Sequence, residues 1–134
     1  MAEKLFRLEI ISPDKIFYTN DVYMAEYNTT EGEVGIYAGH IPMTQIIAPG
    51  RLTITEEHDK KMAALLAGFV EISQEKVTIL AESVEWPQNI DIERARQARI
   101  RAERRLDTQE GGTDIKRAEL ALKRALIRLD IAEH

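Results

Sequence analysis

The sequence predicts a β-then-α fold class, in which an N-terminal β-sandwich is followed by a C-terminal antiparallel two-helix hairpin. Three observations favour it. All four prolines and five of the seven glycines lie at or before position 87, as expected for short strands separated by turns. Beyond that position, apolar residues recur every three or four positions, which is the period of an amphipathic helix. The type of basic residue changes at the same place, from two arginines and five lysines to nine arginines and two lysines, which supports a division of the chain into two parts there.

The first part alternates strand patterns with turn signals. Residues 4–11 alternate polar and apolar side chains, and Ser12-Pro13-Asp14-Lys15 supplies a turn in which proline fixes φ at the second position. Further strands are predicted at residues 21–30, 34–37, 51–55, 61–67, 68–72 and 76–81, separated by turns or loops at 31–33, 39–42, 49–50 and 73–75. Short strands at such spacing indicate an all-β sandwich or barrel.

The segment Trp86-Pro87-Gln88-Asn89 is the predicted boundary, with a β-sandwich domain at 1–86 and a helical hairpin at 90–134. Asp91 and Thr113 are the predicted N-caps, and Gly111-Gly112 the turn between the helices. The apolar stripes are Ile92, Ala95, Ala98, Ala102 and Leu106, and then Ile115, Ala118, Leu122, Ala125, Leu129 and Ala132. A seam rich in alanine buries few methylene groups, each worth roughly 0.8 kcal/mol. We therefore expect a hairpin of low intrinsic stability that is able to move.

Composition limits the function classes. The 134 residues are 44% hydrophobic and 31% charged, which is typical of a globular protein. No apolar run approaches the roughly 20 residues that cross a bilayer, and the first eleven residues do not form a secretory leader. We therefore expect a cytosolic protein, or one held at a membrane by a partner. The net charge of −5 weighs against nucleic-acid binding.

Catalytic and metal-binding signals are missing from the sequence. Without cysteine, disulfides, thiolate catalysis and cysteine-based zinc sites are excluded. The three histidines, His40, His58 and His134, show no metal-ligand spacing. No phosphate-loop, GxGxxG, HExxH or GxSxG motif occurs. We therefore expect no catalytic residue and no metal site, and an enzyme is the least favoured class.

The arginines of the second part are the candidate functional residues. Residues 1–89 carry a net charge of −7 and residues 90–134 a net charge of +2, which together give −5. Arg94 and Arg101 are seven apart and Arg124 and Arg128 four apart, so each pair shares a helix face. In a hairpin, the four guanidinium groups would flank one strip and present forks to a phosphate chain. The alternative is a solvated face with weak ion pairs, which the spacing by itself favours.

Several stretches resemble one family. Residues 31–43, EGEVGIYAGHIPM, are similar to the GELGILPGHxPL stretch of ATP synthase epsilon subunits. IISPD at 10–14 resembles the start of those subunits, AGFVEI at 67–72 their GGFxEV strand, KVTILAE at 76–82 their last strand and RAELALKRA at 117–125 their second helix. These stretches occur in the family's order along almost the whole chain.

The resemblance implies a flattened β-sandwich that binds the gamma subunit and sits on the membrane c-ring. It also implies a hairpin that either folds against the sandwich or extends along gamma toward the alpha and beta catalytic subunits, where it inhibits ATP hydrolysis. The chain is then a non-catalytic peripheral subunit on the cytoplasmic face of the bacterial membrane, and it contacts the membrane only through the complex. No cofactor is required.

One motif implies a ligand. IDIERA at 90–95 resembles the I/L-D-x-x-R-A motif of epsilon subunits that bind ATP. By that resemblance, Ile90 and Asp91 contact the adenine end and the four arginines hold the phosphates. The full implied site is Glu85, Ile90, Asp91, Arg94, Ala95, Arg101, Arg124 and Arg128. The Gly111-Gly112 pair departs from the polar junction common in the family.

Two alternatives to this hypothesis stay open. In the first, the chain is a free-standing nucleotide-binding module. In the second, it is a helical adaptor whose hairpin docks on another acidic partner. Tight co-purification with gamma separates a rotor subunit from both, and strong salt dependence without gamma binding favours the adaptor.

Overall fold

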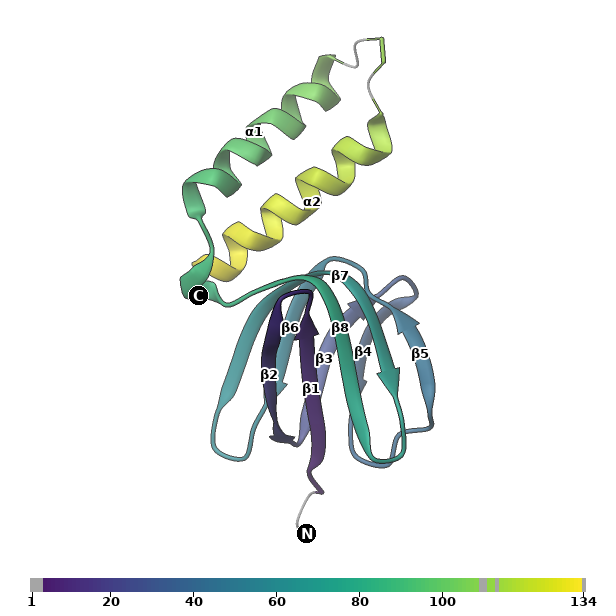
Figure 1. The fold of residues 1–134 in the computed structure, drawn as a ribbon. Coiled ribbons are helices and arrows are strands. Elements are labelled where there is room, and N and C mark those ends of the chain that lie inside the picture. The colour runs from purple at the N-terminus through teal and green to yellow at the C-terminus, as the bar shows by residue number, and fades with distance from the viewer. Residues whose placement is uncertain (1–3, 109–110, 113, 134) are drawn as a thin grey trace. The chain divides into compact units, whose positions relative to one another are not determined.

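The computed structural model describes residues 4–108, 111–112 and 114–133 (Figure 1). It confirms the predicted fold class, because a β-sandwich of eight strands is followed by two helices. The chain divides into two compact units, one ending at Glu85 and the other beginning at Trp86.

The first unit is a single eight-stranded sheet rolled into a sandwich. Its strands run in the order β2-β1-β8-β7-β6-β3-β4, and β5 pairs with β7 off this path. β1 and β8 are parallel, and the other pairs are antiparallel. The strands are β1 (Phe6–Ser12), β2 (Lys15–Val22), β3 (Met24–Thr29), β4 (Gly32–Ile36), β5 (Met43–Ile46), β6 (Gly50–Thr55), β7 (Lys60–Ile72) and β8 (Lys76–Glu85).

The long strand β7 pairs with three other strands, which are β5, β6 and β8. Its first half, residues 60–65, pairs with β6, and its last four residues pair with β5. Between them the register with β8 shifts on either side of Ala67. The prediction of two separate strands at 61–67 and 68–72 is therefore wrong. Gly68 marks a bulge that bends one long strand, and no new strand begins there as the sequence suggested.

Two strands were not predicted. Residues 16–20 belong to β2 and residues 43–46 form β5, and most of the side chains in both strands are exposed or half-buried. Strands without a buried face carry no alternation of polar and apolar residues, so only their pairing partners define them. Other predicted boundaries were also wrong. β8 continues to Glu85 instead of ending at residue 81, and β4 begins at Gly32. The strand predicted at 21–30 is β3, at 24–29, and residues 21–22 belong to β2.

The sandwich core consists of the inward-facing side chains, which alternate with outward-facing ones along each strand. Phe6, Leu8 and Ile10 are buried along β1, and Leu52 and Ile54 along β6, which is the period-two pattern of a sheet with one buried face. The largest fully buried side chains also include Tyr27, Ile36, Leu65, Leu66, Val70 and Ile79. This core holds together strands that are far apart in sequence.

The second unit is an antiparallel hairpin (Figure 1). A short 3-10 turn, η1 (Pro87–Asn89), precedes α1 (Ile92–Thr108), and α2 (Ile115–Ala132) follows the glycine pair. Ala95 and Ala102 of α1 and Ala118 and Ala125 of α2 are buried. The predicted alanine seam therefore holds the two helices together, because small side chains allow their axes to approach closely.

Both helices begin at an aspartate cap. Asp91 Oδ1 accepts a hydrogen bond from the Arg94 N–H at 3.0 Å, and Asp114 Oδ1 accepts one from the Arg117 N–H at 3.1 Å. The first cap agrees with the prediction. The second was predicted at Thr113, which lies outside the described residues, and the structure has Asp114 as the N-cap of α2. Either aspartate satisfies an N–H that the first turn leaves without a helical partner.

Candidate anion-binding site

The buried alanines give a reference direction on each helix. Successive residues of an α-helix are rotated by about 100° around its axis. The seam alanines of α1 and α2 therefore fix the side on which every other side chain of the same helix lies. Because the helices are antiparallel, rotation away from the seam in the same sense leads to the same side of the hairpin on both.

Four predicted site residues share one side of the hairpin. Arg94 and Arg101 lie about 90–110° from the α1 seam, and Arg128 and Arg124 lie about 70–110° from the α2 seam in the same sense. Arg94 is near the start of α1 and Arg128 near the end of α2, so these two lie at the same end of the hairpin. We call this side the arginine face.

Carboxylates lie on the opposite side of both helices. Rotation in the other sense from the seam leads to all the acidic residues of α1 and α2, which are Glu93, Glu103, Asp107, Glu119 and Asp130. The ion pairs Arg96–Glu93, at 3.7 Å, and Arg99–Glu103, at 3.4 Å, also lie there. Within the bounds of the two helices, the arginine face therefore presents guanidinium groups and no carboxylate, which favours an external anion.

Among the described residues, Arg124 is the arginine of this face whose Nε is buried without a partner. Its side chain is half-buried, and its Nε is buried without a hydrogen-bond acceptor among the described residues. A buried donor left without an acceptor costs about 1–3 kcal/mol. Arg99 Nε has no such acceptor either, but that arginine has the Glu103 carboxylate beside it. An oxyanion on the arginine face would supply the acceptor that Arg124 lacks.

The remaining predicted residues have different surroundings. Ile90 is 7% exposed, and Asp91 is exposed and caps α1. Ala95 is 4% exposed, so its methyl group packs in the seam. Glu85 belongs to the first unit, where it ends β8 opposite Ala64 of β7. The second unit thus contains seven of the eight predicted residues, with Ile90 and Asp91 directly before α1 and Ala95 in its first turns.

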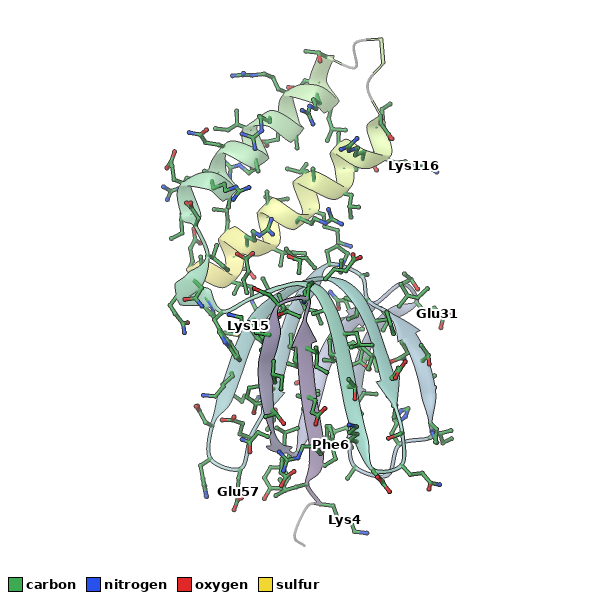
Figure 2. The ribbon with its side chains drawn as sticks, in the orientation of Figure 1. Lys4, Phe6, Lys15, Glu31, Glu57 and Lys116 are labelled. Carbon is green, nitrogen blue, oxygen red and sulfur yellow. The ribbon has the colours of Figure 1, made fainter. Side chains whose placement is uncertain are left out.

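Two arginines of the same face were not among the predicted residues. Arg105 and Arg117 lie about 70° and 90° from their seams, in the same sense as the other four. Both are exposed. Figure 2 shows the side chains of the two helices as sticks, with Lys116 of α2 labelled. The sequence carried a signal for them, because the intervals 94–101–105 and 117–124–128 are both seven and four.

No helix among the described residues is long and apolar enough to cross a membrane. The same residues contain no group of three or more histidine, aspartate or glutamate side chains placed to hold a metal ion.

Comparisons with known proteins agree with the geometry of both units. A family model described as the β-sandwich domain of the ATP synthase delta/epsilon chain matches residues 5–87, and one described as its long α-helix domain matches residues 88–133. The chain is 43% identical over 128 residues to the ATP synthase epsilon chain of Shouchella clausii, covering 96% of this chain and 95% of that one. It is 44% identical over 131 residues to that of Caldanaerobacter subterraneus subsp. tengcongensis, covering 97% and 95%.

Chains in solved ATP synthase structures share this fold. A chain in the mitochondrial ATP synthase of Euglena gracilis, determined with OSCP, F1 and c-ring, has a TM-score of 0.81 and 25% identity, covering 100% of this chain and 84% of that one. A chain in the central stalk and c-ring structure of Tetrahymena thermophila has a TM-score of 0.59 at 14% identity and shares the fold, covering 99% of this chain and 97% of that one. With both family models matched along its length, this chain belongs to the ATP synthase delta/epsilon family, among the bacterial epsilon chains.

Proposed function

We propose that this chain is a non-catalytic rotor subunit that joins the central stalk of a bacterial F-type ATP synthase to its c-ring and regulates ATP hydrolysis. The assembled complex makes ATP from ADP and phosphate, and this chain contributes no catalytic group. Its place is at the cytoplasmic face of the membrane, held there by the gamma subunit and the c-ring. Support comes from its family and from relatives determined together with a c-ring.

Exposed apolar side chains on the sandwich support the partner role. Ile46 of β5 and Phe69 of β7 are cross-strand partners, and they are 63% and 40% exposed. In the loop before β5, Ile41 is 76% exposed and Tyr37 58% exposed. Exposed apolar side chains that gather at one sheet edge are typical of protein interfaces. We assign this edge to the contact with gamma and the c-ring.

The hairpin is the regulatory part of the proposal. When it is extended along gamma, its basic helices face the alpha and beta subunits and ATP hydrolysis is inhibited. When it is folded, it binds ATP through Arg94, Arg101, Arg124 and Arg128 on the phosphates. By the motif resemblance, Ile90 and Asp91 are assigned to the adenine end, and Ala95 and Glu85 complete the proposed set of residues. The observation that carries this assignment is the arginine face with the unpaired Nε of Arg124.

ATP acts here as a regulatory ligand and not as a cofactor. A ligand moves a two-state equilibrium only by its difference in affinity for the two states. If ATP binds the folded hairpin and not the extended one, a high ATP concentration holds the hairpin folded. A falling ATP concentration then releases it toward the inhibitory state.

Isothermal titration of the whole chain with ATP tests the regulatory site. We expect saturable binding that Arg124→Gln weakens by about tenfold or more, since a hydrogen bond to a charged group contributes about 1.5–3 kcal/mol. Arg96→Gln, on the carboxylate side, is the matched control and keeps wild-type affinity. Asp91→Asn tests the adenine end without removing the helix cap. No binding heat at millimolar ATP would remove the regulatory site and leave the stalk role intact.

Co-expression with gamma tests the stalk role separately. We expect a stable complex that survives size-exclusion chromatography and that Ile46→Asp and Phe69→Asp disrupt. A chain that binds ATP but never co-purifies with gamma would instead be a free-standing nucleotide-binding module.

A further inference from the structure

The arginine face is longer than the proposed nucleotide site needs. Arg94 and Arg128 occupy one end of it, Arg124 and Arg101 follow in a staggered arrangement, and Arg105 and Arg117 occupy the end next to the glycine pair. From Arg94 to Arg105 is eleven residues, or about 16 Å of helix. The same distance separates Arg117 from Arg128. A triphosphate held by the first four arginines leaves the last pair without a ligand.

Helix stability does not explain Arg117. It lies in the first turn of α2, which contains no acidic residue. The amino end of a helix carries a partial positive charge, so a cation there is disfavoured and an anion is favoured. The Asp114 cap offsets part of this repulsion through its bond to the Arg117 N–H. An arginine at this position, across the hairpin from Arg105, is therefore better explained by an anion that binds both.

The side chains between the two lines of arginines also restrict the shape of a ligand that can bind here. Ala98 and Ala121 each lie about 50° from their seams, between the seam and the arginines, and both are half-buried. Two lines of guanidinium groups thus flank a strip of methyl groups. A ligand that satisfies both lines must carry negative charge on both flanks along its length. Every unit of a linear polyphosphate does so, whereas an acidic peptide separates its carboxylates by backbone.

We infer that Arg105 and Arg117 extend the anion site toward the glycine pair, so that the hairpin binds linear polyphosphate chains longer than a triphosphate. The inference rests on the proposed function in using the same arginine face. It differs in needing no adenine contact. The bound chain lies along the hairpin, with oxygen atoms accepting hydrogen bonds from arginines of both helices.

The test compares tripolyphosphate with a linear polyphosphate long enough to span the face, titrated against the whole chain at fixed ionic strength. We expect the longer chain to bind at least about tenfold more tightly, as two additional charge-assisted contacts imply. Arg105→Gln with Arg117→Gln should abolish that advantage and leave ATP binding within about twofold. The matched control, Arg96→Gln with Arg104→Gln, removes the same charge from the other sides of α1 and should keep the advantage.

Three results would overturn the inference: equal affinity for the short and long chains, equal losses in both double variants, or equal binding of a poly-glutamate peptide of matched charge. The last would identify an acidic protein segment as the ligand of this face. If the glutamine variants lose helix content by circular dichroism, Arg105→Lys with Arg117→Lys keeps the charge and should retain only part of the advantage. Polyphosphate binding without ATP binding would refute the proposed ATP site alone, and the reverse would refute this inference alone.

Discussion

Gly68 lies at the bend of β7, where its φ of +135° is one that side chains rarely allow. A Cβ atom built there would lie 2.2 Å from the Leu80 carbonyl oxygen and 2.9 Å from the Ala81 Cα. Both are backbone atoms of the neighbouring strand, so they cannot swing away as a side chain could. The bulge that lets β7 pair with both β5 and β6 therefore depends on one glycine.

We expect Gly68→Ala to lower the free energy of unfolding by more than about 2 kcal/mol, because both the φ angle and the approach of β8 oppose a Cβ atom. Urea unfolding followed by circular dichroism measures it. Gly35→Ala is the control, since a Cβ atom there meets only side-chain atoms at 3.8 Å. Equal and small changes in both variants would show that the bulge tolerates a side chain.

The burial of Tyr27 leads us to expect that the protein loses stability at high pH. It is 1% exposed, its hydroxyl donates to Gln45 Oε1 at 2.6 Å, and burial raises its pKa from 10.0 to about 12. The folded state therefore keeps this proton at pH values where the unfolded state has lost it. The stabilisation is complete below pH 10 and is lost as the pH rises toward 12, by an amount of order 2 kcal/mol.

Urea unfolding at intervals from pH 8 to pH 12 checks this prediction. Tyr27→Phe should be less stable than the wild type at pH 8, because it loses a hydrogen bond, and its stability should fall less steeply above pH 10. Parallel curves for the two proteins would mean that Tyr27 does not titrate differently on folding.

At the scale of elements, the two units are stabilised differently. Contacts between residues far apart in sequence stabilise the sandwich. In one of them, the Tyr18 hydroxyl of β2 donates a hydrogen bond of 2.5 Å to Oε2 of Glu56, which directly follows β6. Burial, and then this bond to Glu56, raises the pKa of Tyr18 well above its usual range. The helices depend on the alanine seam and on their caps, so a single cap contributes a larger share of local stability there.

Asp114→Ala should destabilise the first turn of α2 by about 1 kcal/mol, because the Arg117 N–H loses its acceptor. Native-state hydrogen exchange of the whole chain reports it as faster exchange of the Arg117 amide. Asp114→Asn keeps a capping oxygen and should restore most of the protection. Unchanged exchange in the alanine variant would mean that another group caps the helix.

At the scale of the whole molecule, the sandwich and the hairpin differ in what they bury. The sandwich buries many large side chains, among them Leu8, Ile10 and Ile79. Among the described residues of the second unit, the buried ones are four alanines with Ile90 and Ile131. Buried apolar area is the main source of stability, so the hairpin is the weaker unit and the one suited to move.

Hydrogen exchange at the scale of the units tests this difference. We expect the slowest amides of α1 and α2 to open with a free energy of order 2 kcal/mol below that of the slowest amides in β7 and β8. A single common opening energy would mean that the two units unfold together, and the hairpin would not then be an independent moving part.

The sequence by itself determined the fold class, the helix period, the alanine seam and the cap at Asp91. Each of these depends on neighbours within a few positions along the chain, where side-chain spacing and backbone preference act directly. Strands with a buried face, such as β1 and β6, could be predicted from the sequence for the same reason. The ATP site came from a motif resemblance and stays a proposal.

Only the tertiary structure decided which distant groups meet. The edge strands β2 and β5 have no buried face of their own, so their partners in β1 and β7 define them. Gly68 lies in a bulge within one long strand, where β8 passes against it. Helical spacing places Arg105 and Arg117 with the predicted arginines of their own helices, and the antiparallel pairing of α1 and α2 brings the two sets onto one face. Contacts between residues far apart in sequence depend on packing, and local pattern does not encode them.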